Sequence, residues 1–160
     1  MRVYAEDPAR GDLPQAGKLL LYREPSMPGV RVDSGYVEGG DVSVHYDPLI
    51  AKVIASADTR EAARRRALAA LRDFPILGIR TNIPLLLDIL AHPRFVTGDV
   101  DTGFLEAEAD SLPARSEGDP PPAVVAVAAA VESATATTTS AGVAGGRRPD
   151  PWLSLRGTRV

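Results

Sequence analysis

The distribution of large apolar side chains constrains this chain more than any other feature of its sequence. Leucine, isoleucine, methionine and aromatic residues recur throughout residues 1–108, whereas the apolar residues between Pro113 and Pro149 are no larger than valine. A domain must bury apolar area to offset the entropy of ordering its chain, so only the first part can form a core. The predicted division is therefore a domain over residues 1–108, a Pro/Ala/Thr-rich and largely disordered linker over 109–149, and the truncated start of a following domain over 150–160.

Composition narrows the classes of function. The 160 residues include 18 Lys and Arg and 21 Asp and Glu, without the basic excess that is typical of nucleic-acid binders. There is no cysteine and there are only two histidines, which excludes thiolate ligands and argues against a His-rich metal site. The apolar run Ala123 to Val131 is too short to span a bilayer, and the N-terminus lacks the apolar segment of a secretory signal. We therefore expect a cytoplasmic protein with neither a nucleic-acid nor a membrane partner.

Proline and glycine punctuate a series of short β-type segments in the first half. This spacing is typical of an antiparallel sheet or a small barrel-sandwich. The expected strands are residues 3–5, 18–22, 30–33, 41–44 and 49–55.

The apolar period then changes to that of helices. Asp58 is expected to cap a helix that runs to Phe74, with Glu61 completing a capping box. After Pro75, residues 76–80 are expected to form a short edge strand, and Asn82 is expected to cap a second helix over residues 83–91. The predicted fold class is α+β: a mainly antiparallel sheet or small barrel-sandwich, a helical pair, and a low-complexity tail.

Several polar residues invite either a functional or a structural interpretation. Arg64 to Arg66 could form an anion or nucleic-acid patch, or simply the solvated face of a helix. His45 and Asp47 would share one face of a strand, either as an acid–base pair or as a structural hydrogen bond, with Tyr46 packed on the other face. His92 is expected to satisfy the C-terminal end of the second helix. No phosphate-binding glycine loop or serine-nucleophile motif occurs.

An ordered set of short motifs carries more information. The set consists of Arg2-Val3-Tyr4-Ala5-Glu6-Asp7-Pro8, Leu13-Pro14-Gln15-Ala16-Gly17-Lys18, Gly29-Val30-Arg31-Val32-Asp33-Ser34, Tyr46-Asp47-Pro48-Leu49-Ile50-Ala51-Lys52, Gly78-Ile79-Arg80-Thr81-Asn82-Ile83 and Asp101-Thr102-Gly103-Phe104-Leu105. In this order and spacing it resembles the C-terminal domain of biotin carboxylase, from biotin-dependent acyl-CoA carboxylase α-subunits. The resemblance covers residues 2–106, and the segment around Trp152 resembles a domain join of the methylcrotonyl-CoA carboxylase type. Pro75 departs from the acidic or aromatic residue of that family, which is expected to weaken the strand after it.

The resemblance implies roles for three residues. Arg2 matches an active-site arginine that holds the ureido oxygen of biotin, although an exposed charge on a frayed N-terminus is the alternative for it. A guanidinium suits that role because it stays protonated and can stabilise negative charge developing on the oxygen. Arg31 and Asp47 match homodimer-interface positions, with an intramolecular surface salt bridge as the alternative.

The resemblance also implies what the intact enzyme contains. Such a biotin carboxylase is an ATP-dependent ligase that uses ATP, Mg²⁺, bicarbonate and biotin, and these residues alone provide no cofactor site and no metal site. Its partners would be the ATP-grasp region, a biotin carrier domain and a carboxyltransferase subunit. The chain is therefore expected to be inactive alone, as a segment of the enzyme; the alternative is a non-catalytic module for dimerisation or assembly. The acyl-CoA acceptor is not specified by the sequence.

Overall fold

The computed structural model describes residues 1–115, 126–127 and 129–130, and the account below concerns the compact unit that begins at Met1. Its strands are β1 (Arg2–Tyr4), β2 (Glu6–Asp7), β3 (Leu13–Pro14), β4 (Gly17–Lys18), β5 (Leu21–Tyr22), β6 (Val30–Ser34), β7 (Asp41–Val42), β8 (Leu49–Ala55) and β9 (Ile76–Leu77). Its helices are α1 (Arg60–Arg72), α2 (Ile83–Ala91), α3 (Pro93–Thr97) and α4 (Phe104–Ala107), with 3-10 turns η1 (Pro8–Arg10), η2 (Ala109–Ser111) and η3 (Pro113–Arg115).

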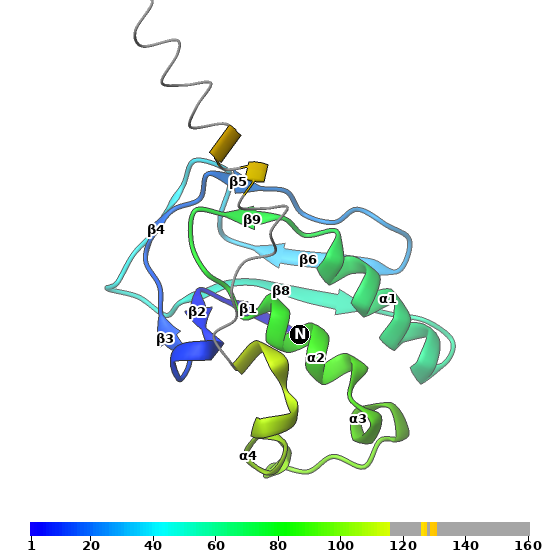
Figure 1. The fold of residues 1–160 in the computed structure, drawn as a ribbon. Helices are drawn as coiled ribbons and strands as arrows, with labels where there is room; N and C mark the ends of the chain where they lie inside the picture. The colour runs from blue at the N-terminus through cyan, green and yellow to red at the C-terminus, as the bar shows by residue number, and fades with distance from the viewer. Residues whose placement is uncertain (116–125, 128, 131–160) are drawn as a thin grey trace, which may run out of the picture. The chain divides into compact units, whose positions relative to one another are not determined.

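Strand β8 is the centre of the main sheet. It pairs antiparallel with β1 on one side and β6 on the other, and the smaller pairs are β2–β3, β4–β7 and β5–β9, all antiparallel (Figure 1). The strands of the described chain form no closed barrel, so the antiparallel-sheet form of the α+β prediction is the one observed. Six of the seven residues of β8 are apolar, Lys52 being the exception, so this strand can pair on both edges and pack against a helix.

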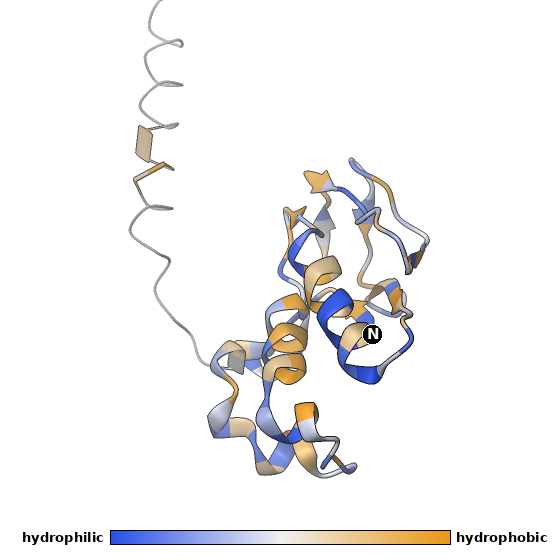
Figure 2. Ribbon diagram, turned by 90° about the vertical axis from the view of Figure 1, so that its right-hand side faces the viewer, coloured by the Kyte–Doolittle hydropathy of each residue, from blue (hydrophilic) through white to orange (hydrophobic). Residues whose placement is uncertain are grey.

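Helices α1 and α2 build the core against this sheet. Helix α1 packs on β8 and α2 packs on α1. The two helices differ in composition: α1 is largely hydrophilic, whereas α2 is mostly hydrophobic (Figure 2). The largest fully buried apolar side chains are Val3, Leu19, Ile50, Val53 and Leu71.

The cap of α1 differs from the prediction. Thr59, not Asp58, is the N-cap, and its hydroxyl accepts the N–H of Ala62 at 3.2 Å. Glu61 does not return to the cap, because its carboxylate binds Arg64 at 2.8 Å instead. The pattern located the helix start to within one residue, but two adjacent residues can both cap a helix and the structure selects the second.

Three consecutive arginines of α1, Arg64 to Arg66, contact other groups of the molecule. The Arg64 side chain is only 14% exposed and donates to the carbonyl of Leu90 at 2.8 Å, near the end of α2. Arg66 donates to the carbonyl of Ser56, and Arg65 lies 3.4 Å from Glu61. A guanidinium at the C-terminal end of a helix satisfies free carbonyls. Arg64 therefore joins two helices and is not a solvated or nucleic-acid-binding side chain.

The chain remains packed beyond α4. Leu112 is buried, and the N–H of Ala114 donates to the Asp88 carboxylate at 2.8 Å, which ties η3 to α2. Most of the predicted linker and all of residues 150–160 lie outside the described residues, so those assignments stay predictions. Within the described part, no helix combines the length and apolar character needed to cross a membrane.

Candidate functional site

The backbone of Arg2 is firmly held. Strand β1 pairs with β8, and the terminal amino group of Met1 donates to the carbonyl of Val53 at 2.7 Å. The guanidinium of Arg2 is exposed and donates to the Tyr4 hydroxyl at 3.3 Å. The frayed-terminus alternative for Arg2 is therefore wrong for the backbone, while the side chain is presented to solvent from an ordered strand.

Arg2 begins a row of charges across the main sheet. The register places Arg2 opposite Lys52 on β8, and Lys52 opposite Asp33 on β6. Lys52 and Arg31 each come within 3.0 Å of the Asp33 carboxylate. Lys52 first, and Arg31 after it, hold the pKa of Asp33 below its ordinary value. Because Lys52 is drawn towards Asp33, the repulsion expected between directly opposed cations on β1 and β8 is relieved.

The charge of Asp47 acts on Arg2, whereas Arg31 pairs with Asp33. It lies in the loop before β8, where its carboxylate accepts the N–H of Leu49 at 2.8 Å. The hydrogen bond to Tyr4 is the largest cause that raises the pKa of Arg2, and the charge of Asp47 adds to it. Arg31 lies within 3.0 Å of Asp33, so an intramolecular surface pair is present at Arg31.

The expected His45–Asp47 pair is not formed. Residues 43–48 are a turn and loop and not a strand, so alternation does not place the two side chains on one face. The N–H of His45 donates to the Ser43 hydroxyl at 3.1 Å, and His45 is exposed. Tyr46, expected to pack, is 81% exposed. The strand pattern failed here because the strand β7 ends at Val42.

Asn82 makes contacts that the sequence did not reveal. It occupies the N-cap position of α2, as predicted, but its side chain makes no capping hydrogen bond. Instead its amide oxygen accepts the N–H of Tyr4 at 2.9 Å, and its amide nitrogen donates to the carbonyl of Arg2 at 3.3 Å. The N–H of Asn82 also donates to the carbonyl of Tyr4 at 3.1 Å. The sequence also did not predict Lys52, Asp33 and Tyr4 as members of this site. Strand alternation places Tyr4 on the same face as Arg2, and this pattern could have indicated the role of Tyr4.

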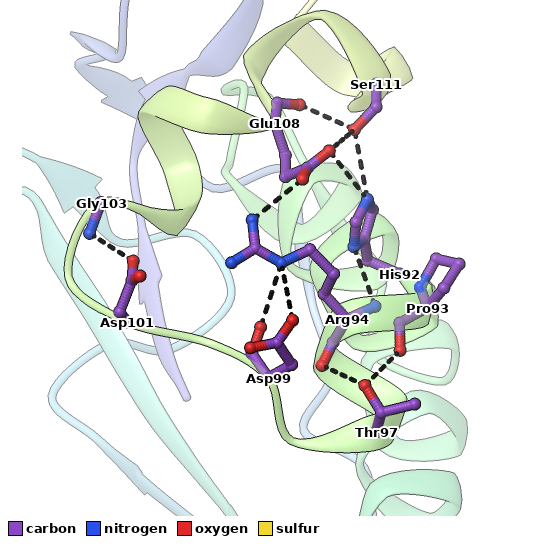
Figure 3. A network of polar contacts seen from close by, with 9 residues as sticks. All are labelled: His92, Pro93, Arg94, Thr97, Asp99, Asp101, Gly103, Glu108 and Ser111. Carbon is purple, nitrogen blue, oxygen red and sulfur yellow. Dashed lines mark hydrogen bonds and ion pairs between the residues drawn. The ribbon is translucent and has the colours of Figure 1, made fainter.

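A second polar network, around His92, is structural (Figure 3). His92 ends α2 and also caps α3, since its Nδ1 accepts the N–H of Arg94 at 3.3 Å. Its Nε2 lies 3.2 Å from the Ser111 hydroxyl and 3.4 Å from Glu108, and Glu108 binds Arg94 at 3.0 Å. Arg94 also lies 3.4 Å from Asp99. The network joins α2 and α3 to the chain after α4, with both histidine nitrogens engaged.

The arrangement around Arg2 suits an anionic group. Arg2, Arg31 and Lys52 place cationic side chains on the open face of the sheet, with Asp33 engaging two of them. A guanidinium offers five donors, and one of those on Arg2 is directed to Tyr4. Among the described residues there is no group of three or more His, Asp or Glu side chains placed to hold a metal ion. The face can therefore orient or stabilise negative charge.

The sequence of this chain is similar to those of known biotin-dependent carboxylases. The family model of the biotin carboxylase C-terminal domain matches residues 1–107. Over 106 residues, 65% of this chain, it is 50% identical to the propionyl-CoA carboxylase alpha chain of Caenorhabditis elegans and 47% identical to that of Homo sapiens. These matches cover 15% of each relative, so the chain spans a small part of the length of the curated relatives it matches.

Solved structures show the same fold. The biotin carboxylase domain dimer of Hydrogenobacter thermophilus 2-oxoglutarate carboxylase, in complex with MgADP, ADP and bicarbonate, superposes with a TM-score of 0.69 at 34% identity. That match covers 74% of this chain and 25% of the other. Complete Rhizobium etli pyruvate carboxylase gives a TM-score of 0.68 at 33% identity, covering 76% of this chain and 12% of that one.

Proposed function

The chain belongs to the family of biotin carboxylase C-terminal domains, and we propose that it is the C-terminal segment of a biotin carboxylase that carboxylates biotin with bicarbonate at the expense of ATP. The carboxylated biotin would serve acyl-CoA carboxylation. The observation that supports this most directly is the exposed guanidinium of Arg2, held on a paired strand at the head of the family's first motif. The propionyl-CoA carboxylase relatives support the acyl-CoA class without specifying the acceptor, and the methylcrotonyl-CoA type and the cytoplasmic location stay predictions.

In the proposed reaction Arg2 stabilises charge and does not transfer a proton. In this reaction a ureido nitrogen of biotin would lose its proton to a base supplied elsewhere in the enzyme and bond to the carbon of bicarbonate. One C–O bond of that carbon would break, and its oxygen would leave in the phosphate released from ATP. The negative charge left behind is shared with the ureido oxygen, and a positioned guanidinium stabilises it there. Tyr4 accepts one N–H of Arg2 and so orients the planar group. Lys52 is occupied by Asp33, which leaves Arg2 as the cation of the row that is available to the substrate.

The remaining chemistry is assigned to other parts of the enzyme. ATP, Mg²⁺ and bicarbonate would be held by an ATP-grasp region, and biotin would arrive on a carrier domain before passing its carboxyl group to a carboxyltransferase subunit. The described residues offer no cluster of three metal-ligating side chains, so no step of the reaction is assigned to a metal held by them. We therefore propose that this chain is inactive when it is alone.

A non-catalytic role in assembly is the second candidate. Strand β6 is an edge strand of the main sheet, and the Arg31 side chain on it is 70% exposed. The related Hydrogenobacter structure is a biotin carboxylase domain dimer. We propose that Arg31 and Asp47 lie in a homodimer interface of this protein. In sedimentation velocity the wild-type chain should form a dimer that Arg31→Glu weakens, whereas a monomer at all concentrations would remove this candidate.

The catalytic proposal is tested by complementation. The purified chain and a separately expressed ATP-grasp region of a biotin carboxylase are assayed alone and together for biotin-dependent fixation of labelled bicarbonate in the presence of MgATP. Neither part alone should turn over, and the mixture or a fusion of the two should. Turnover by the 160-residue chain alone, or no gain from the chain over the ATP-grasp region alone, would refute the proposal.

A further inference from the structure

We propose that Asn82 is a positioning residue for Arg2, acting through the main chain of β1. The inference rests on the proposed role of Arg2 in biotin carboxylation. It concerns a side chain on the opposite edge of β1 from β8, and it assigns Asn82 no contact with substrate.

The main chain of β1 is held from both edges. Met1 bonds to Val53 of β8 through both its N–H and its carbonyl, at 2.7 and 2.9 Å. Because extended backbone alternates, the main-chain groups of Arg2 and Tyr4 point away from β8. Asn82 meets them there with three hydrogen bonds, to the Arg2 carbonyl, the Tyr4 N–H and the Tyr4 carbonyl. Asn82 thus supplies, at the edge of β1 that faces away from β8, the hydrogen bonds that a neighbouring strand would otherwise make.

Because its side chain binds β1, Asn82 does not cap α2 with a side-chain hydrogen bond. Asparagine at an N-cap normally accepts a hydrogen bond from the first turn of its helix, yet the α2 cap has none from its side chain. Pro84 lies in the first turn of α2 and has no N–H, which lowers the need for a cap. The Asn82 side chain is largely buried, and the carboxamide supplies both an acceptor and donors, as this edge of β1 requires. Local rules that are broken without loss of order tend to mark functional positions.

The hydrogen bonds of Asn82 affect the Arg2 guanidinium because Arg2 and Tyr4 lie on the same face of β1. Fixing the carbonyl of Arg2 and both main-chain groups of Tyr4 sets the direction in which each side chain leaves the strand. The Tyr4 hydroxyl then accepts from the guanidinium of Arg2 at 3.3 Å. Loss of the Asn82 side-chain amide would remove two of these three hydrogen bonds, to the Arg2 carbonyl and the Tyr4 N–H, and so loosen the position of both side chains. A shift of the guanidinium by about 1 Å is enough to lower a rate by roughly 100-fold.

The first test uses the chain as it is. Backbone amide exchange of Tyr4 and the side-chain N–H signals of Arg2 are measured by NMR in wild type, Asn82→Ala, Asn82→Asp and the control Asp88→Ala. The control removes a partly buried hydrogen bond to Ala114 from the same helix, away from β1. We expect at least about tenfold faster Tyr4 exchange in Asn82→Ala alone, since one lost hydrogen bond changes an opening equilibrium by roughly that factor. Arg2 signals should change in both Asn82 variants and stay as in wild type in Asp88→Ala.

The Asn82→Asp variant tests the two side-chain hydrogen bonds one at a time. It also keeps the test decisive if Asn82→Ala fails to fold. The carboxylate still accepts the Tyr4 N–H but cannot donate to the Arg2 carbonyl. Arg2 signals should therefore change in Asn82→Asp while Tyr4 exchange stays close to wild type. Unchanged Arg2 signals in both Asn82 variants would overturn the proposal, whatever the outcome for catalysis.

The second test is kinetic and uses the carboxylase reconstituted with the ATP-grasp region. Asn82→Ala should lower kcat/KM for biotin by about 10- to 100-fold and leave KM for ATP unchanged, while Asp88→Ala stays within about twofold of wild type. Equal losses for both variants, or an equal effect on biotin and ATP, would show that Asn82 only stabilises the fold. If Arg2→Ala retained full activity, the proposed function itself would fail, which distinguishes that failure from failure of the Asn82 proposal.

Discussion

The carboxylate of Asp7 lies 3.4 Å from the guanidinium of Arg80, and this ion pair joins two motifs that are far apart in the sequence. The Asp7 side chain is only 3% exposed, and its second oxygen accepts the N–H of Ala9 at 3.2 Å. Arg10 approaches the same oxygen as Arg80, at 3.8 Å. The buried carboxylate therefore fixes the turn after β2 to the segment that leads into α2, where Asn82 meets β1.

Asp7→Asn should destabilise the chain through loss of this buried charge. We expect the free energy of unfolding to fall by about 2–3 kcal/mol, because hydrogen bonds to a charged group are worth more than neutral ones and the ion pairs of this carboxylate with Arg10 and Arg80 are lost. Urea unfolding followed by circular dichroism measures the change, with the exposed Asp41→Asn as control. A loss no larger than that of the control would contradict the account.

Gly78→Ala should be more damaging than a second glycine substitution of similar backbone geometry. Gly78 has φ +107°, and a Cβ there would lie 2.0 Å from the carbonyl oxygen of Lys18, whereas Gly11 has φ +67° and nothing within 4 Å of such a Cβ. Gly11→Ala should cost about 1–2 kcal/mol from its left-handed backbone alone, and Gly78→Ala about 3–5 kcal/mol because backbone must also move. Thermal unfolding of the two variants decides this, and equal costs would count against the close approach of Gly78 to the main chain of Lys18.

Glu108 should make stability fall at acid pH. The hydrogen bond from Arg94 holds the pKa of Glu108 below its ordinary value. A depressed carboxyl pKa contributes stability above the pKa of the unfolded chain, and this contribution is lost as the pH falls through the folded value. Urea midpoints measured from pH 7 down to about pH 3, below the ordinary glutamate pKa, should therefore decline less steeply in Glu108→Gln than in wild type. Parallel curves for the two proteins would contradict the role of this pair.

Glu6 should act in the opposite direction. Burial raises the pKa of Glu6, and the charges of Asp12 and Asp47 raise it further. A raised carboxyl pKa means that the folded chain binds the proton more tightly, so stability falls as the pH rises through the folded value. Glu6→Gln should therefore be more stable than wild type at neutral pH, and the difference should vanish at acid pH. A variant less stable at pH 7 would show that the Glu6 charge has a favourable partner.

The elements that the sequence predicted best were those with a strong local signal. Strand β8 and helix α2 begin and end where expected, at Leu49–Ala55 and Ile83–Ala91. Each is a mainly apolar run with one charged residue, Lys52 or Asp88, and each begins after a proline or a capping residue, so neighbouring elements had little influence on its limits. The motif order over residues 2–106 also identified the family, whose model matches residues 1–107.

The parts that failed depend on contacts across the chain. Residues 18–22 were expected to form one strand, but Lys18 pairs with β7 and Leu21–Tyr22 pairs with β9, which divides the segment. His92-Pro93 was expected only to end a helix, yet proline in the first turn also begins α3. The use of the Asn82 side chain was hidden for the same reason, because its partners lie at the other end of the domain sequence.

The central claim is that Arg2 supplies the charge stabilisation for biotin carboxylation, and its most direct test is a single kinetic comparison. Labelled bicarbonate transfer to free biotin is measured in the reconstituted carboxylase with wild-type chain, Arg2→Ala and the control Arg72→Ala, which removes an exposed arginine at the end of α1. We expect Arg2→Ala to lower kcat by about 100-fold or more, with Arg72→Ala unchanged, because one donor to a developing oxyanion is typically worth that factor. Full activity in the Arg2→Ala enzyme, with the domain folded, would contradict the account.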